Sequence, residues 1–62
     1  MLGPNPLCQE TLDSMINTIK IENNRRIMLG LPPVRSPGII EQDRTIRRLI
    51  GILAYHGQLD KI

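Results

Sequence analysis

The 62-residue chain contains no phenylalanine and no tryptophan, and Tyr55 is its only aromatic residue. A hydrophobic core must therefore be built from aliphatic side chains, chiefly those of leucine, isoleucine and methionine. Cys8 is the only cysteine, which excludes a disulfide within the chain. One cysteine and one histidine, His56, are too few for a four-ligand structural zinc site. We therefore expect no metal and no cofactor, and association with another chain is the remaining means of stabilising so small a domain.

A long hydrophobic run is also missing. No segment approaches the roughly 18 consecutive apolar residues of a membrane-spanning helix. The N-terminal MLGPNP lacks the basic start and the apolar stretch of a signal peptide. Charged residues make up 23% of the chain, a share typical of globular domains. We therefore predict a single cytoplasmic domain without membrane association, and the free Cys8 suits a reducing compartment.

Positive charge is concentrated in the middle of the chain. The net charge is +2, but between residues 25 and 48 only Glu41 and Asp43 oppose six arginines. These arginines are the candidate contact residues for a partner: Arg25, Arg26, Arg35, Arg44, Arg47 and Arg48. Such a cluster can bind an acidic protein surface or the phosphates of nucleic acid. A solvated surface with local ion pairs is the simpler alternative.

The first half of the chain predicts a helix over about residues 6–29. Asn5 followed by Pro6 is typical of a helix start, and Gly30 lies where a terminating glycine is expected. A stripe of apolar residues recurs at helical spacing: Cys8, Leu12, Met15, Ile16, Ile19 and Ile27. Asn23 falls on this stripe, where it is either tolerated as a polar residue or sets the register between helices. The strand-like alternation in TIKIE, followed by two asparagines, leaves open a break in this helix.

The segment LGLPPVRSPGII, residues 29–40, holds three of the five prolines and two of the five glycines. Residues before proline favour extended geometry, so we expect a loop over about residues 30–36. Ser36 and Pro37 repeat the cap-then-proline pattern and predict the start of a second helix. A polyproline ligand is disfavoured because the PxxP spacing is absent. The loop instead turns the chain into an antiparallel helical hairpin and gathers the arginines at one end.

The second helix is predicted over about residues 37–56, ending before Gly57. Its main apolar face contains Ile39, Ile46, Leu49, Ile50 and Leu53. A second stripe on the opposite side contains Ile52, Tyr55, Leu59 and Ile62, the last two only if the helix passes Gly57. A helix that is apolar all round is buried on more than one side, and a lone hairpin cannot cover both stripes. We therefore predict an all-α homodimer or larger assembly, a four-helix bundle joined through Leu49, Ile50, Gly51, Ile52, Leu53 and Tyr55.

A catalytic site is the weaker hypothesis. The hairpin would bring Cys8 near His56, and a helix N-terminus together with a histidine can activate a thiol. Asp60 is a possible third group, but a chain this short offers little room for a pocket, and a glycine-rich phosphate loop is absent. We therefore predict no catalytic residue, no enzymatic activity and no small-molecule substrate.

The charge and the apolar patterning together predict a small, non-enzymatic protein–protein interaction module. We expect it to self-associate and to act as an accessory or regulatory, including inhibitory, subunit of a larger partner with an acidic surface. The alternative is a dimeric DNA-binding regulator that uses the basic loop end and the second helix. A structural role as a building block of a larger assembly is a third hypothesis.

Overall fold

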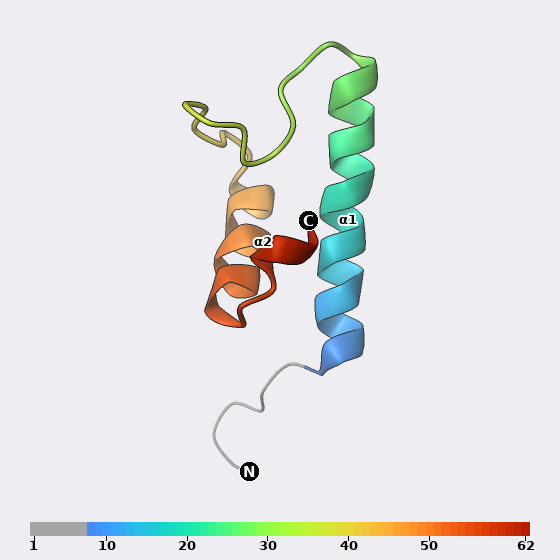
Figure 1. Ribbon diagram of the computed structural model, residues 1–62, viewed down its shortest axis with the longest axis vertical. Helices are drawn as coiled ribbons and strands as arrows, with labels where there is room; N and C mark the ends of the chain where they lie inside the picture. The colour runs from blue at the N-terminus through green and yellow to red at the C-terminus, as the bar shows by residue number, and fades with distance from the viewer. Residues whose placement is uncertain (1–7) are drawn as a thin grey trace.

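The computed structural model describes residues 8–62, and two helices make up most of this part of the chain (Figure 1). Helix α1 spans Gln9–Met28, helix α2 spans Arg44–Tyr55, and a short 3-10 turn, η1, spans Leu59–Lys61. The helices contact each other and run in opposite directions (Figure 1). No strand occurs among the described residues, which confirms the predicted all-α class. The four-helix bundle involves a second chain and stays a prediction.

Helix α1 begins one residue after Cys8, whose backbone is extended and whose side chain caps no helical amide. The predicted start at Asn5 and Pro6 lies outside the described residues. The helix then runs unbroken past Asn23 and Asn24, so the alternation in TIKIE marks no break. In the helix, each backbone amide of this segment finds a carbonyl one turn earlier. A single strand without a partner strand would have left these groups unpaired.

A glycine in the left-handed backbone region follows each helix. Gly30 has a φ of 76° and Gly57 a φ of 67°, values that side chains with a Cβ rarely adopt. After Gly57, the Gln58 amide donates to the Leu53 carbonyl at 2.8 Å, a bond that closes the helix end by turning the chain back. Both helix ends therefore lie close to the positions that these glycines predict.

The predicted start of the second helix at Pro37 is wrong. Helix α2 begins seven residues later, at Arg44. The Ser36 hydroxyl donates to the Pro33 carbonyl at 2.7 Å instead of capping a helix. Gly38 then adopts a φ of 78°, which a right-handed helix does not tolerate. The pair that resembles a helix start is part of a tight turn within the loop.

Asp43 caps α2 instead. Its Oδ1 accepts hydrogen bonds from the Thr45 amide at 2.8 Å and the Ile46 amide at 3.2 Å. These are two of the free amides at a helix start, and a carboxylate is well suited to that positive end. The connection between the helices is consequently longer than predicted and covers residues 29–43.

The core lies between the helices and is aliphatic, as the composition requires. Its buried residues are Leu12, Ile16, Ile19, Val34, Ile46 and Leu53. Those partly buried against it are Met15, Leu49, Ile50, Ile52, Leu59 and Ile62. Three residues assigned to the main apolar faces from the sequence lie outside the core: Cys8 is exposed, Ile27 is 61% exposed and Ile39 is 52% exposed. Ile27 occupies the last turn of α1, beyond the reach of α2, and Ile39 belongs to the loop.

The segment after α2 folds back onto the core. Because α2 stops at Tyr55, η1 turns towards α1, and Leu59 and Ile62 pack against the same cluster as Ile52. Three of the four residues of the second stripe are thus covered within one chain, and only Tyr55, 87% exposed, is not. A single chain can therefore cover most of the second stripe, and that stripe no longer requires a second chain. The predicted dimer needs a different basis.

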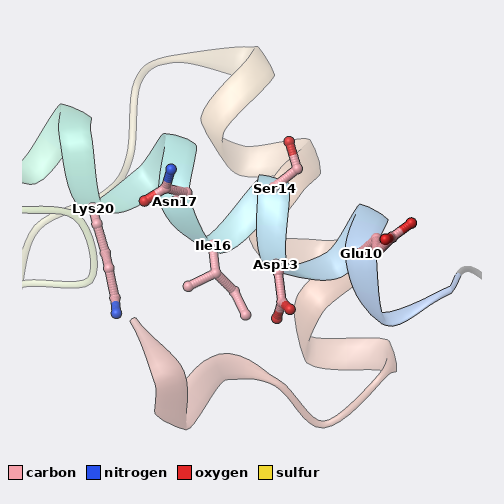
Figure 2. A pocket seen from close by; sticks show the side chains of 6 residues that line it. All are labelled: Glu10, Asp13, Ser14, Ile16, Asn17 and Lys20. Carbon is pink, nitrogen blue, oxygen red and sulfur yellow. The ribbon is translucent and has the colours of Figure 1, made fainter.

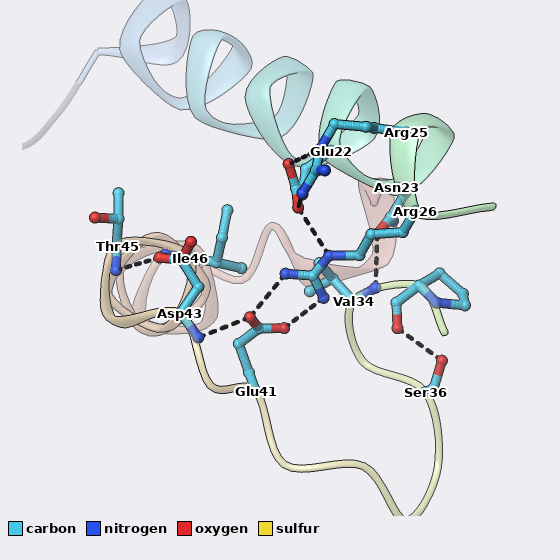
Figure 3. A network of polar contacts seen from close by, with 11 residues as sticks. Glu22, Asn23, Arg25, Arg26, Val34, Ser36, Glu41, Asp43, Thr45 and Ile46 are labelled. Atoms are coloured by element: carbon cyan, nitrogen blue, oxygen red, sulfur yellow. Dashed lines mark hydrogen bonds and ion pairs between the residues drawn. The ribbon is translucent and has the colours of Figure 1, made fainter. Parts of the chain in front are cut away.

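The loop is tied to α1 through Asn23. Its Oδ1 accepts a hydrogen bond from the Val34 amide at 2.6 Å, and the Val34 side chain is buried in the core (Figure 3). Asn23 is partly buried because it faces the loop. Asn23 thus lies on the apolar stripe because it binds the loop of its own chain. The sequence predicted either a tolerated polar residue or one that sets the register between helices, and neither includes this contact.

We expect Asn23→Ala to lower the free energy of unfolding by about 1–2 kcal/mol, because it leaves a partly buried Val34 amide without its acceptor. Asn24→Ala is the matched control, since Asn24 is exposed on the same turn and gains the same helix propensity. The control should change stability by no more than about 0.5 kcal/mol. Urea unfolding followed by circular dichroism measures both. Equal effects of the two changes would show that the Asn23–Val34 bond does not hold the loop.

Candidate interaction surface

Two of the six candidate arginines are engaged in ion pairs within the chain. The Arg26 guanidinium donates two parallel hydrogen bonds to Glu41, each 2.8 Å long, and a third to Glu22 at 2.9 Å (Figure 3). Arg25 binds the same Glu22 carboxylate at 2.6 Å. The side chains of Arg26 and Glu41 are only 14% and 12% exposed. Arg26 therefore links α1 to the loop and presents little surface to a partner.

The carboxylates of this network hold their charge strongly. Hydrogen bonds from Arg25 and then from Arg26 lower the pKa of Glu22 to about 2, from an ordinary value of 4.5. The hydrogen bonds from Arg26 likewise lower the pKa of Glu41. In return, Glu41 and Glu22 raise the pKa of Arg26. All members remain charged at neutral pH, so the link between α1 and the loop is ionic.

Arg35 also makes a contact within the chain. Its guanidinium donates to the Leu59 carbonyl at 2.9 Å and so joins the loop to η1. Its backbone has a φ of 71°, in the left-handed region that residues other than glycine seldom occupy. The side chain is nevertheless exposed, which leaves part of its charge available to solvent.

The remaining three arginines form an exposed group on α2. Arg44, Arg47 and Arg48 line one shallow depression of about 390 Å³. No carboxylate of residues 8–62 forms an ion pair with any of them. The structure therefore divides the predicted cluster into arginines that hold the chain together and arginines that face outwards.

The same side of α2 continues with two small residues and one tyrosine. Gly51, Ala54 and Tyr55 are exposed, and their spacing places them on one face with the three arginines. A Cβ added to Gly51 would meet no atom within 4 Å. We call this surface the outer face of α2: Arg44, Arg47, Arg48, Gly51, Ala54 and Tyr55. Its first half is basic, and its second half permits close approach of another helix.

The other residues predicted for self-association point inwards. Leu53 is fully buried, and Leu49, Ile50 and Ile52 are partly buried against the core of their own chain. These four side chains are therefore occupied in the structure of one chain. Of the six residues in the prediction, Gly51 and Tyr55 lie on an exposed surface.

The cysteine and histidine make separate contacts. The Cys8 thiol lies 3.2 Å from the Thr11 hydroxyl, and this hydrogen bond lowers the pKa of Cys8. The His56 ring packs edge-on against Tyr55, with the ring centres 5.2 Å apart. No hydrogen bond joins Cys8 to His56 in the described part of the chain. The thiol and imidazole are thus not arranged as a nucleophile and its base.

An open groove of about 510 Å³ runs along α1. Its lining residues are Glu10, Asp13, Ser14, Ile16, Asn17 and Lys20, shown in Figure 2. The charges in it are of both signs, and they lie on the surface above the buried Ile16. Within residues 8–62, no three histidine, cysteine, aspartate or glutamate side chains are grouped closely enough to hold a metal ion. The groove offers no chemistry beyond weak polar contacts.

Neither helix of residues 8–62 combines the length and the hydropathy that a membrane span requires. No family model, curated protein or solved structure matches the chain. The candidate surface is consequently defined by its own geometry and charge.

The spacing of Glu22, three and four residues before Arg25 and Arg26, predicts the two ion pairs that the structure shows on α1. The sequence did not predict the pair of Arg26 with Glu41 in the loop. Helical spacing also assigned Ile27 to the core. Residues 27–34 contain no polar side chain, so they cannot all belong to one buried stripe of a helix. This run was the signal that apolar side chains at the end of α1 are exposed.

We expect acidification to destabilise the fold through the Arg26 network. The low pKa of Glu22 means that its ion pairs stabilise fully above its ordinary pKa of 4.5 and are lost as the pH falls towards about 2. The melting temperature should therefore fall between about pH 5 and about pH 2. Glu41→Gln should reduce this fall, because it removes one of the groups that must be protonated.

Glu10→Gln is the matched control, since Glu10 is exposed and forms no ion pair among the described residues. It should leave the dependence of melting temperature on pH as in the unaltered chain. Thermal unfolding by circular dichroism provides the measurement. An unaltered pH profile in Glu41→Gln would contradict the stabilising role of the network.

Proposed function

We propose that the protein is a small, non-enzymatic interaction module that binds an acidic protein partner through the outer face of α2. One observation carries the proposal. Three arginines of the chain are engaged in contacts with Glu22, Glu41 or a backbone carbonyl, whereas Arg44, Arg47 and Arg48 share one exposed depression without a carboxylate partner. An accessory or regulatory subunit of a larger protein would use such a surface.

The arrangement of these arginines suits carboxylates. Arg44 and Arg48 are one helical turn apart, where like charges repel by a few tenths of a kcal/mol. An acidic surface relieves that repulsion, and each guanidinium can bind a carboxylate through two parallel hydrogen bonds. Arg26 and Glu41 form this type of pair within the chain itself.

Self-association is the second part of the proposal. Among residues 8–62, eight large apolar side chains are exposed against six buried ones, which is a small core for a stable monomer. Gly51 and Ala54 allow a helix from a second copy to approach α2 closely. An antiparallel crossing at Gly51 would keep the arginines of the two copies apart, because it places each group beside the partner's Tyr55.

Binding of duplex DNA by such a dimer is the competing function. Arginine contacts to phosphate require no aromatic residue, and α2 presents its arginines along one face. The single aromatic residue, Tyr55, lies at the far end of α2, so stacking on unpaired bases has no support near the arginines.

We expect the double change Arg44→Glu and Arg48→Glu to abolish capture of the partner from an extract of the native host, without loss of helicity. The physical reason is that two attractive contacts become repulsive towards an acidic surface. The double change Lys20→Glu and Lys61→Glu alters the net charge equally but lies outside the outer face of α2, so it should preserve capture. Quantitative mass spectrometry of the captured proteins measures both.

Duplex DNA provides the competing outcome. If two copies used both arginines on phosphates, the log–log salt slope would be about −3.6, and fourfold more salt would weaken binding roughly a hundredfold. Fluorescence anisotropy with a labelled duplex at low salt tests this. DNA binding that depends on Arg44 and Arg48 would replace the protein-partner proposal, and equal capture by both double variants would refute it.

We expect Gly51→Ala to have opposite effects on folding and on association. Alanine favours the helix by about 1 kcal/mol relative to glycine, and the added Cβ meets nothing within the chain. The free energy of unfolding at high dilution should therefore rise by about that amount. The same Cβ obstructs a closely packed second helix, so the molar mass by light scattering should fall towards that of a monomer. A stabilised variant with unchanged association would place the self-contact away from Gly51.

A further inference from the structure

The exposed apolar side chains gather at one end of the molecule. Of the eight large ones, six lie in the last turn of α1 and in the loop: Ile27, Met28, Leu29, Leu31, Ile39 and Ile40. We call this group the apolar tip. The end of α1 and the loop occupy the upper part of Figure 1, whereas α2 begins beside the loop and runs away from it.

The apolar tip has no single apolar side. Ile27, Met28 and Leu29 are consecutive, so their side chains project about 100° apart around the helix axis. They are 61%, 87% and 60% exposed. Leu31, Ile39 and Ile40 line a separate groove of about 310 Å³ beside the helix end, and charged residues of the Arg26 network, Glu22, Arg25, Arg26 and Glu41, line it as well. A protein partner that contacts one face would leave part of this surface in water, whereas a surrounding apolar medium would cover all of it.

Positive charge lies in the same part of the sequence as the apolar tip. Between residues 22 and 48 six arginines face three carboxylates, while the other described residues carry three carboxylates against two lysines. Glu22 and Glu41 are held in ion pairs and Asp43 caps α2, which leaves Arg35, Arg44, Arg47 and Arg48 without a carboxylate partner. Of these four, Arg35 donates to the Leu59 carbonyl of η1 and the other three lie on α2, so the positive charge lies on the loop and α2, further along the molecule than the apolar tip.

The spacing of apolar and basic residues matches a lipid interface. Arg25 precedes Leu29 by four residues, about 6 Å along the helix axis. Peripheral segments bury their apolar side chains about 5–10 Å into the boundary between headgroups and acyl chains. Arginines at the level of Arg25 and below would then lie among the phosphates of anionic lipids, which attract basic residues.

We propose that the apolar tip docks on an anionic lipid surface, with the arginines around it contacting the headgroups. This surface is distinct from the outer face of α2 apart from the shared arginines, and the docking needs no membrane-spanning helix. The expectation of no membrane association was drawn from the lack of a spanning segment, which does not bear on docking from one side.

Two exposed isoleucines on α1 allow a matched test. Ile27 is 61% exposed and belongs to the apolar tip, whereas Ile21 is 63% exposed and lies about 9 Å further down the helix. The probe is a phosphatidylcholine vesicle that contains phosphatidylserine, and cosedimentation measures the bound fraction. Ile27→Ser should weaken binding roughly tenfold, because one buried aliphatic side chain is lost. Ile21→Ser should bind like the unaltered chain.

Charge provides the second arm of the test. Vesicles of phosphatidylcholine alone should bind more weakly than those with phosphatidylserine, and added salt should weaken binding to the latter. Circular dichroism checks that each variant keeps its helicity. Should Ile27→Ser unfold, Met28→Ser takes its place, since Met28 is 87% exposed and makes little contact with the chain.

Three results would overturn the proposal. The first is a failure of the unaltered chain to sediment with phosphatidylserine vesicles at low salt, and the second is equal binding by the Ile27 and Ile21 variants. The third is a lower molar mass for Ile27→Ser in the absence of lipid, which would show that a second copy covers the apolar tip. None of these results depends on capture of a protein partner, so this proposal and the proposed function fail independently.

Discussion

The guanidinium group of Arg26 joins the two halves of the described chain. It donates to Glu22 on its own helix and, through two parallel bonds, to Glu41 in the loop. The Glu41 carboxylate also accepts the Asp43 amide at 3.0 Å. Since Asp43 caps α2, a continuous set of polar contacts runs from the last turns of α1 to the first turn of α2 (Figure 3). The place where α2 begins depends on this link.

Both candidate surfaces follow from that link. The loop can be long because it is held by Arg26, by Asn23 and by the contact of Arg35 with η1. Holding the loop close to α1 brings its isoleucines to the end of the helix and forms the apolar tip. It also starts α2 at Arg44, so that the arginines of the first turns face outwards. The same carboxylates that stabilise the fold thus determine which arginines remain unpaired.

The small core makes exposure of apolar residues unavoidable. Six buried aliphatic side chains are sandwiched between two helices and η1, and a chain of this length buries only about 60% of the surface that it exposes when unfolded. What distinguishes this molecule is where the remaining apolar side chains lie. In the described part of the chain they are concentrated at the apolar tip, and only Ile21 and Tyr55 lie elsewhere. A contact with another molecule at that end would offset the cost of leaving them in water.

The sequence by itself determined the all-α class, the two helices, their glycine-terminated ends and the aliphatic core residues of α1, because these depend on local propensity and on helical periodicity. It also indicated the ion pairs of Glu22 with Arg25 and Arg26, but not the pair of Arg26 with Glu41 that joins the loop to α1. Only the tertiary structure decided that Ser36 caps no helix and Asp43 does, that η1 covers the second stripe, and that Ile27 lies outside the core. Each of these depends on contacts between residues distant in the chain, such as Arg26 with Glu41 and Asn23 with Val34. Local patterns cannot predict such contacts, because several turns and caps of nearly equal free energy fit the same loop sequence until tertiary contacts select one.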